Sequence, residues 1–143
     1  MNTTKKETWK VFKFGGSSLA NTACFVRVSK IILDSYIASE EQPHSIIVSA
    51  MGGFTDLLIK ISKDVPAESL KSSSEYKSII DRISIISNDL LDSTESEKYL
   101  QEISEDFIEI KKILDQSNNN KGVLRKGKSD IIAGYGELWS ARL

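Results

Sequence analysis

The chain has 143 residues, 40% of them hydrophobic and 27% charged, which is typical of a globular domain with one core. Its formal net charge of −1 gives no basic excess for nucleic acid, and its single cysteine, Cys24, excludes an internal disulfide. The single histidine, His44, argues against a histidine-based metal centre. No apolar run approaches the roughly 20 residues that span a bilayer, and the first ten residues lack the apolar core of a signal peptide. We therefore expect a cytoplasmic protein with no nucleic-acid or membrane partner.

The first predicted strand, residues 9–14, ends in two glycines and two serines, an order typical of a site for a phosphate-sized anion. Gly15 and Gly16 lack a Cβ, so a ligand can approach the backbone closely and successive N–H groups can surround it. Ser17 adds a hydroxyl donor, and Lys13 adds a mobile positive charge. The lysine precedes the glycines, which excludes a Walker A loop, and the third glycine of a dinucleotide fingerprint is missing. A plain turn with a surface lysine is the alternative, and this stretch alone leaves both open.

A second glycine pair follows a second predicted strand. Asn21 is a candidate N-cap for a helix to about residue 39. Residues 44–50 predict a strand that is buried on both faces, because its centre is continuously apolar. The strand–helix–strand order predicts a right-handed parallel unit whose strands end at one edge, where open α/β sheets bind ligands. Gly52 and Gly53 should therefore lie beside the first glycine pair.

The rest of the chain is predicted to be helical. Residues 54–63 form one helix, and two amphipathic helices within residues 68–116 form an antiparallel hairpin joined near residues 92–95. We expect this hairpin to pack beside the sheet, away from the ligand edge. The charged side chains of the hairpin then form a solvated face. The alternative is that they form a docking surface for a partner. An exposed loop, residues 117–128, leads to a last helix capped by Ser129.

Three blocks of this sequence resemble the aspartokinase family within the amino-acid kinase superfamily. They are residues 13–20 (KFGGSSLA), 48–56 (VSAMGGFTD) and 134–143 (GYGELWSARL). The last block and the helical insertion are most similar to the aspartokinase half of bifunctional aspartokinase–homoserine dehydrogenases. The resemblance implies an α/β fold, the N-terminal part of a three-layer sandwich with a mainly parallel sheet. Residues 1–143 would then be the N-terminal portion of the catalytic domain, with a helical insertion at about 66–118.

The resemblance also implies a reaction, the ATP-dependent phosphorylation of the side-chain carboxylate of L-aspartate to aspartyl phosphate. This is the first step of the biosynthesis of aspartate-family amino acids, and Mg²⁺ would accompany the ATP. The residues matching the family's phosphate and ATP contacts are Lys13, which is also the catalytic residue, Gly15, Gly16 and Ser17. Those matching its aspartate contacts are Ser49, Thr55 and Glu137, with Glu137 holding the substrate ammonium group. Arg142 is expected only to support its helix.

The chain is expected to be an incomplete part of such an enzyme, inactive alone and homo-oligomeric in its full-length form. For Ser49 and Thr55 the structural alternative is ordinary turn and N-cap chemistry, and for Glu137 it is a place on the solvent face of a helix. Two alternatives concern the whole chain. One is a non-catalytic homologue or helical interaction module, and the other is an amino-acid kinase with a different carboxylate acceptor.

Overall fold

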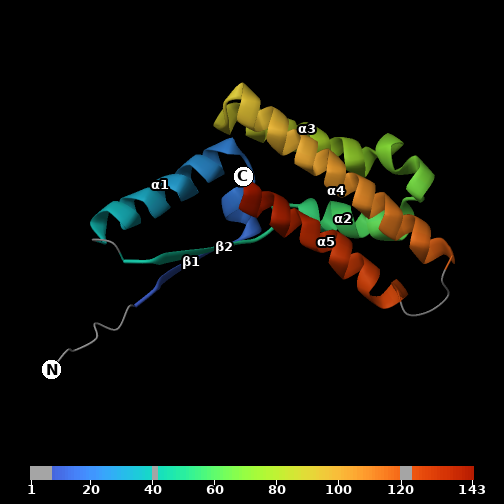
Figure 1. Ribbon diagram of the computed structural model, residues 1–143, viewed down its shortest axis with the longest axis horizontal. Coiled ribbons are helices and arrows are strands. Elements are labelled where there is room, and N and C mark those ends of the chain that lie inside the picture. Colours follow the sequence, from blue (N-terminus) through green and yellow to red (C-terminus); the bar gives the residue numbers. More distant parts are fainter. Residues whose placement is uncertain (1–7, 40–41, 120–123) are drawn as a thin grey trace.

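A pair of parallel strands joined by a helix lies at one end of the protein (Figure 1). The computed structural model describes residues 8–39, 42–119 and 124–143. Strand β1 (Lys10–Phe14) pairs with β2 (His44–Val48) in a register that places Phe14 opposite Val48. Both strands therefore end at the same edge, as the sequence predicts.

Helix α1 (Thr22–Ala38) connects the two strands. Its N-cap is Asn21, as predicted, and the Asn21 side chain accepts a hydrogen bond of 3.1 Å from the backbone N–H of Cys24. A short 3-10 helix, η1 (Gly16–Leu19), separates β1 from α1 and buries Leu19. The first glycine pair thus lies between a strand and a tight helical turn.

The predicted helical hairpin is confirmed. Helix α2 (Phe54–Asp64) and a 3-10 segment, η2 (Ala67–Ser72), lead into α3 (Ser74–Leu90), and α4 (Ser93–Asn119) returns antiparallel to it. The predicted apolar stripes are buried in both helices: Ile79, Ile83 and Ile86 in α3, and Tyr99, Ile103, Phe107, Ile110 and Leu114 in α4. These side chains form most of the core on the helical side of the molecule.

The predicted loop at residues 117–128 is largely wrong. Helix α4 continues to its end at Asn119, and α5 (Leu124–Arg142) has already begun before Ser129; residues 120–123 lie outside the described part of the chain. Ser129 is not the N-cap, because it lies inside α5 and its hydroxyl is hydrogen-bonded to that of Ser62 in α2. Asparagine has a weak intrinsic helix propensity, so the asparagines in this stretch favour a loop prediction. Packing of α5 against α2 and α4 outweighs that propensity and extends the helices.

The sheet is less buried than its apolar sequence predicts. In β2 the side chains of Ile46 and Ile47 are 38% and 48% exposed, and in β1 Val11 is 59% exposed. Helix α1 covers only part of the two strands, which leaves apolar surface on the remainder (Figure 1). The prediction of a strand buried on both faces is therefore wrong for this chain.

The helices of the described residues are too short or too polar to cross a membrane.

Candidate functional site

The two glycine pairs touch where the strands end. A Cβ on Gly16 would lie 2.8 Å from the carbonyl oxygen of Ala50, and a Cβ on Gly52 would lie 3.2 Å from the carbonyl oxygen of Gly16. The backbone N–H of Ser49 also donates to the carbonyl of Phe14 at 3.0 Å, which continues the strand pairing up to the loops. Only residues without a side chain allow this approach. We call residues 15–20 the first glycine loop and residues 49–53 the second.

The second glycine loop ends in a tight turn that starts α2. The backbone N–H of Phe54 donates to the carbonyl of Met51 at 2.9 Å, and Gly53 has φ 82° and ψ −4°. These angles are those of the third residue of a type II turn, a position that favours glycine because φ is positive. Gly53 is also the N-cap of α2, and no side chain caps this helix. The alternative role of Thr55 as an N-cap is therefore wrong.

Arg82 of α3 reaches both glycine loops, a contact that the sequence does not predict. Its Nη2 donates to the carbonyl of Gly52 at 2.8 Å and to that of Ala20 at 3.3 Å. Its guanidinium carbon lies 4.6 Å from the ring centroid of Phe54, within cation–π range. Burial lowers the pKa of this guanidinium from its usual value. The expectation that the hairpin stays away from the ligand edge is therefore wrong at Arg82.

Helix α5 packs against the second glycine loop through Gly136. A Cβ on Gly136 would lie 2.9 Å from the Cβ of Ala50, 3.3 Å from Cδ1 of Leu58 and 3.7 Å from the Cβ of Phe54. Glu137 is the next residue along α5. The third sequence block thus meets the second one in space, although some 80 residues separate them along the chain.

A network of hydrogen bonds fixes α5 on the hairpin. The Trp139 indole N–H donates to Asp106 at 2.8 Å, and Arg142 donates to the same carboxylate at 2.6 Å. The Tyr99 hydroxyl donates to the carbonyl of Trp139 at 2.9 Å. Arg142 therefore links α5 to α4 and does more than support its own helix.

The structure brings the predicted phosphate contacts together in the first glycine loop. Lys13 near the end of β1, Gly15 and Ser17 are exposed, and Gly16 is half-buried against the second loop. Within the described residues, the side chains of Lys13 and Ser17 make no hydrogen bond or ion pair. They are therefore available to a ligand at this edge.

The predicted aspartate contacts lie on three elements around the second glycine loop. Ser49 follows β2 and is half-buried, Thr55 is exposed in the first turn of α2, and Glu137 is exposed on α5. None of the three side chains has a hydrogen-bonding or charged partner in the part of the chain that the structure describes. Glu137 is therefore solvent-exposed on α5, as expected if it lies on the solvent face of its helix.

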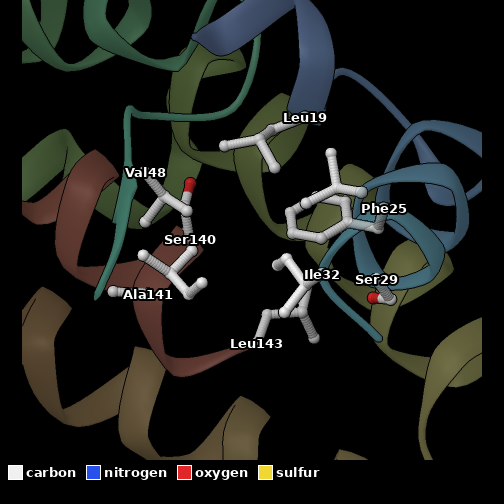
Figure 2. Close-up of a pocket in the computed structure, with 10 residues that line it drawn as sticks. Leu19, Phe25, Ser29, Ile32, Val48, Ser140, Ala141 and Leu143 are labelled. Carbon is white, nitrogen blue, oxygen red and sulfur yellow. The ribbon is translucent and has the colours of Figure 1, made fainter. Parts of the chain in front are cut away.

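The apolar pocket in Figure 2 does not fit a charged ligand. It lies between α1, β2 and the C-terminal end of α5, and its labelled walls include Leu19, Phe25, Ile32, Val48 and Leu143. Leu19 comes from η1, so the pocket lies behind the first glycine loop. Its lining suits packing of an apolar group. The exposed backbone and the lysine of the neighbouring edge suit an anion better.

No group of three or more His, Cys, Asp or Glu residues within the described ranges could hold a metal ion.

Parallel strands that end in two touching glycine loops define an α/β domain whose strand ends have the geometry that ligand-binding edges use. The sequence matches the model of the family described as the amino acid kinase family over residues 8–143, and the chain belongs to this family. The predicted α/β fold with an inserted helical hairpin is thereby confirmed, together with the resemblance to aspartokinases.

Similar proteins support the same assignment. The chain is 27% identical over 139 residues to bifunctional aspartokinase/homoserine dehydrogenase 2, chloroplastic, of Arabidopsis thaliana, covering 97% of this chain and 15% of that protein. It is 30% identical over 135 residues to bifunctional aspartokinase/homoserine dehydrogenase 2 of Escherichia coli strain K12, covering 94% of this chain and 15% of that protein. The chain thus spans about 15% of the length of these curated relatives.

Two solved structures of E. coli aspartokinase III share the fold. One is a complex with lysine and aspartate, with a TM-score of 0.69 and 22% identity, and the match covers 94% of this chain and 27% of that one. The other is a complex with aspartate and ADP, with a TM-score of 0.71 and 21% identity, and the match covers 93% of this chain and 27% of that one.

Proposed function

We propose that this chain is the N-terminal portion of an aspartokinase catalytic domain, with residues 66–118 as a helical insertion. The reaction is the transfer of the γ-phosphoryl group of ATP to the side-chain carboxylate of L-aspartate. The observation that carries the proposal is the contact of both glycine loops at one sheet edge, with Gly136 packed against the second. Relatives named as aspartokinases, and an aspartokinase solved with aspartate and ADP, support this choice of substrates.

The proposed chemistry matches the residue types at the edge. The acceptor carboxylate has a reference pKa of about 3.9, so it is ionised at neutral pH and needs no general base. Its oxygen attacks the γ-phosphorus while the bond to the bridging oxygen of ADP breaks, and ADP leaves. Two anions must approach each other, so positive charge and N–H donors lower the barrier. Lys13 and the amides of Gly15 and Gly16 supply these groups, and Ser17 adds a hydroxyl.

The proposed aspartate contacts hold the acceptor in line with the phosphate. Glu137 binds the substrate ammonium group through its carboxylate, and the hydroxyls of Ser49 and Thr55 donate to substrate oxygens. Mg²⁺, bound mainly through the triphosphate, neutralises part of the phosphate charge. We further propose that the full-length protein is a cytoplasmic homo-oligomer whose small-molecule partners are L-aspartate and ATP.

Coupled ADP release by the complete gene product tests the proposal. The assay offers L-aspartate, L-glutamate and N-acetyl-L-glutamate as alternative acceptors at saturating ATP and Mg²⁺. The expected result is turnover with L-aspartate alone. Turnover with one of the other two acceptors would identify a different amino-acid kinase. The absence of turnover with all three would favour a non-catalytic protein.

A further inference from the structure

A single arginine from the inserted hairpin joins the two glycine loops. Arg82 lies near the middle of α3, half-buried at the border of the apolar face that Ile79 and Ile83 form. It accounts for both hydrogen bonds that α3 makes to carbonyls of the glycine loops, at Ala20 and at Gly52. These carbonyls belong to segments that follow different strands. Because one nitrogen atom binds both, displacement of either loop breaks a hydrogen bond.

The contact with Gly52 also fixes the orientation of one peptide group. The turn from Met51 to Phe54 is of type II, in which the peptide between the two central residues is rotated by about 180° relative to a type I turn. A trans peptide is planar, so its N–H points opposite to its C=O. Arg82 holds the C=O of Gly52, and the N–H of Gly53 therefore points away from the hairpin. A flip of this peptide requires the Arg82 contact to break.

The positive charge of Arg82 stays uncompensated by a carboxylate. Within the described residues Arg82 forms no ion pair, and its partners are two carbonyls and the ring of Phe54. An arginine is seldom buried without an acidic partner, because transfer of its charge from water is costly. Here the half-buried guanidinium lies against both glycine loops, and Lys13 is exposed near the end of the strand that precedes the first loop. The guanidinium therefore adds to the positive potential that these loops present to an anion.

We propose that Arg82 is a positioning residue that locks both glycine loops in one anion-binding geometry and thereby sets the rate of phosphoryl transfer. This inference rests on the proposed function for the reaction that it affects. It extends that function by giving the inserted hairpin a part in the active site. Arg82 acts through the loop backbone and touches neither substrate.

Hydrogen exchange of the complete gene product tests the loop contact without using activity. The variants are Arg82→Gln and Arg82→Lys, and Arg27→Gln is the matched control because Arg27 is exposed on α1 and has no partner among the described residues. Arg82→Gln should speed exchange roughly tenfold or more in peptides covering both loops, as expected for loss of a charge-assisted hydrogen bond. Arg82→Lys should restore part of the protection, because an ammonium can donate to both carbonyls.

The pattern of exchange separates positioning from general stability. Faster exchange confined to the two loops supports the proposal. Faster exchange that spreads equally through α3 and α4, or unchanged exchange in the loops, overturns it. If wild-type protein shows no aspartate-dependent turnover, the proposed function fails, while this exchange pattern still decides whether Arg82 holds the loops.

Kinetics test the catalytic consequence in an active protein. Arg82→Gln should lower kcat by roughly 10- to 100-fold, the range expected when reacting groups are misplaced by about an ångström. The KM for aspartate should change little, because the proposed contacts of that substrate stay intact. A kcat within about twofold of wild type, with the loops more mobile, overturns the proposal, since the contact would then have no bearing on the reaction.

Discussion

Lys13 is the residue on which the proposed chemistry depends most. It is exposed and has no partner within the described residues, so its removal should leave the fold intact. In the complete gene product Lys13→Ala should raise the barrier by about 3 kcal/mol, or roughly 100-fold or more in kcat, as does loss of one oxyanion donor. Steady-state kinetics measure the change in kcat, and thermal melting measures the stability of the fold.

The control variant is Lys30→Ala, at an exposed position on α1, which should leave kcat unchanged. Equal kcat values for the two variants would make Lys13 an ordinary surface lysine.

In the proposed function, Glu137 binds the ammonium group of the acceptor amino acid. Glu137→Gln keeps the shape and removes the charge, so a charge-assisted hydrogen bond worth about 1.5–3 kcal/mol should be lost. Since about 1.4 kcal/mol corresponds to a tenfold change in affinity, the KM for aspartate should rise by roughly 10- to 150-fold. The KM for ATP should hardly change. Glu97→Gln, at an exposed position on α4, is the control. A rise confined to ATP, or no rise at all, would return Glu137 to a purely solvent-facing role.

At this scale the sequence predicts most residues of the candidate site but not Arg82. The glycines, Lys13 and Glu137 stand in recognisable blocks that the sheet edge requires. Arg82 cannot be found in this way, because an arginine at the border of the apolar face of an amphipathic helix has the same sequence pattern as one that extends into solvent. Its partners, Ala20 and Gly52, are backbone carbonyls some 62 and 30 residues away. Only the packing of α3 on the loops reveals them.

Helix α5 is held at the site by close packing at Gly136. In Gly136→Ala the new Cβ would lie 2.9 Å from that of Ala50, so α5 or the second glycine loop must move. Overpacking should lower stability by about 1–2 kcal/mol even after the gain in helix propensity. Gly134→Ala is the matched control, because its Cβ meets nothing within 4 Å, and it should raise stability by about 0.5–1 kcal/mol. Chemical denaturation measures both. Equal shifts would mean that Gly136 is not in contact with the loop.

The hairpin is held by its buried stripe. Ile83 is fully buried in α3, whereas Ile85 in the same helix is 61% exposed. Ile83→Asp should therefore lower the free energy of unfolding by about 2 kcal/mol or more, because it buries a charge. Ile85→Asp should change it by about 0.5 kcal/mol or less, as surface substitutions usually do. Similar melting temperatures for the two variants would mean that the stripe is a docking face.

Elements with a clear apolar period are predicted well from the sequence. The hairpin follows from stripes that repeat every three or four residues, and the strand–helix–strand unit follows from apolar runs bounded by glycines. The connection before α5 is mispredicted for a physical reason. Its polar and asparagine-rich sequence has weak helix propensity, yet α4 extends to Asn119 and α5 starts at Leu124. Packing against α2 and the network around Trp139 stabilise helix where propensity alone does not.

At the scale of the whole molecule, the chain corresponds to only part of the proteins that it resembles. The chain spans 27% of the aspartokinase III chains whose fold it shares, and within its described residues the proposed site consists of the two glycine loops and the residues around them. The 143-residue chain expressed alone should therefore release no ADP above background with aspartate, whereas the complete gene product should be active. Turnover by the chain alone would show that a whole active site is formed within these residues.

Trapping the product of the complete gene product with hydroxylamine tests the central claim most directly. Aspartyl phosphate is an acyl phosphate, so hydroxylamine converts it to aspartyl hydroxamate, while ADP release alone does not identify the acceptor. The account predicts hydroxamate that depends on ATP, on Mg²⁺ and on L-aspartate, and that falls roughly 100-fold or more in Lys13→Ala. Hydroxamate formed at an unchanged rate by Lys13→Ala, or ADP released without any hydroxamate, would contradict it.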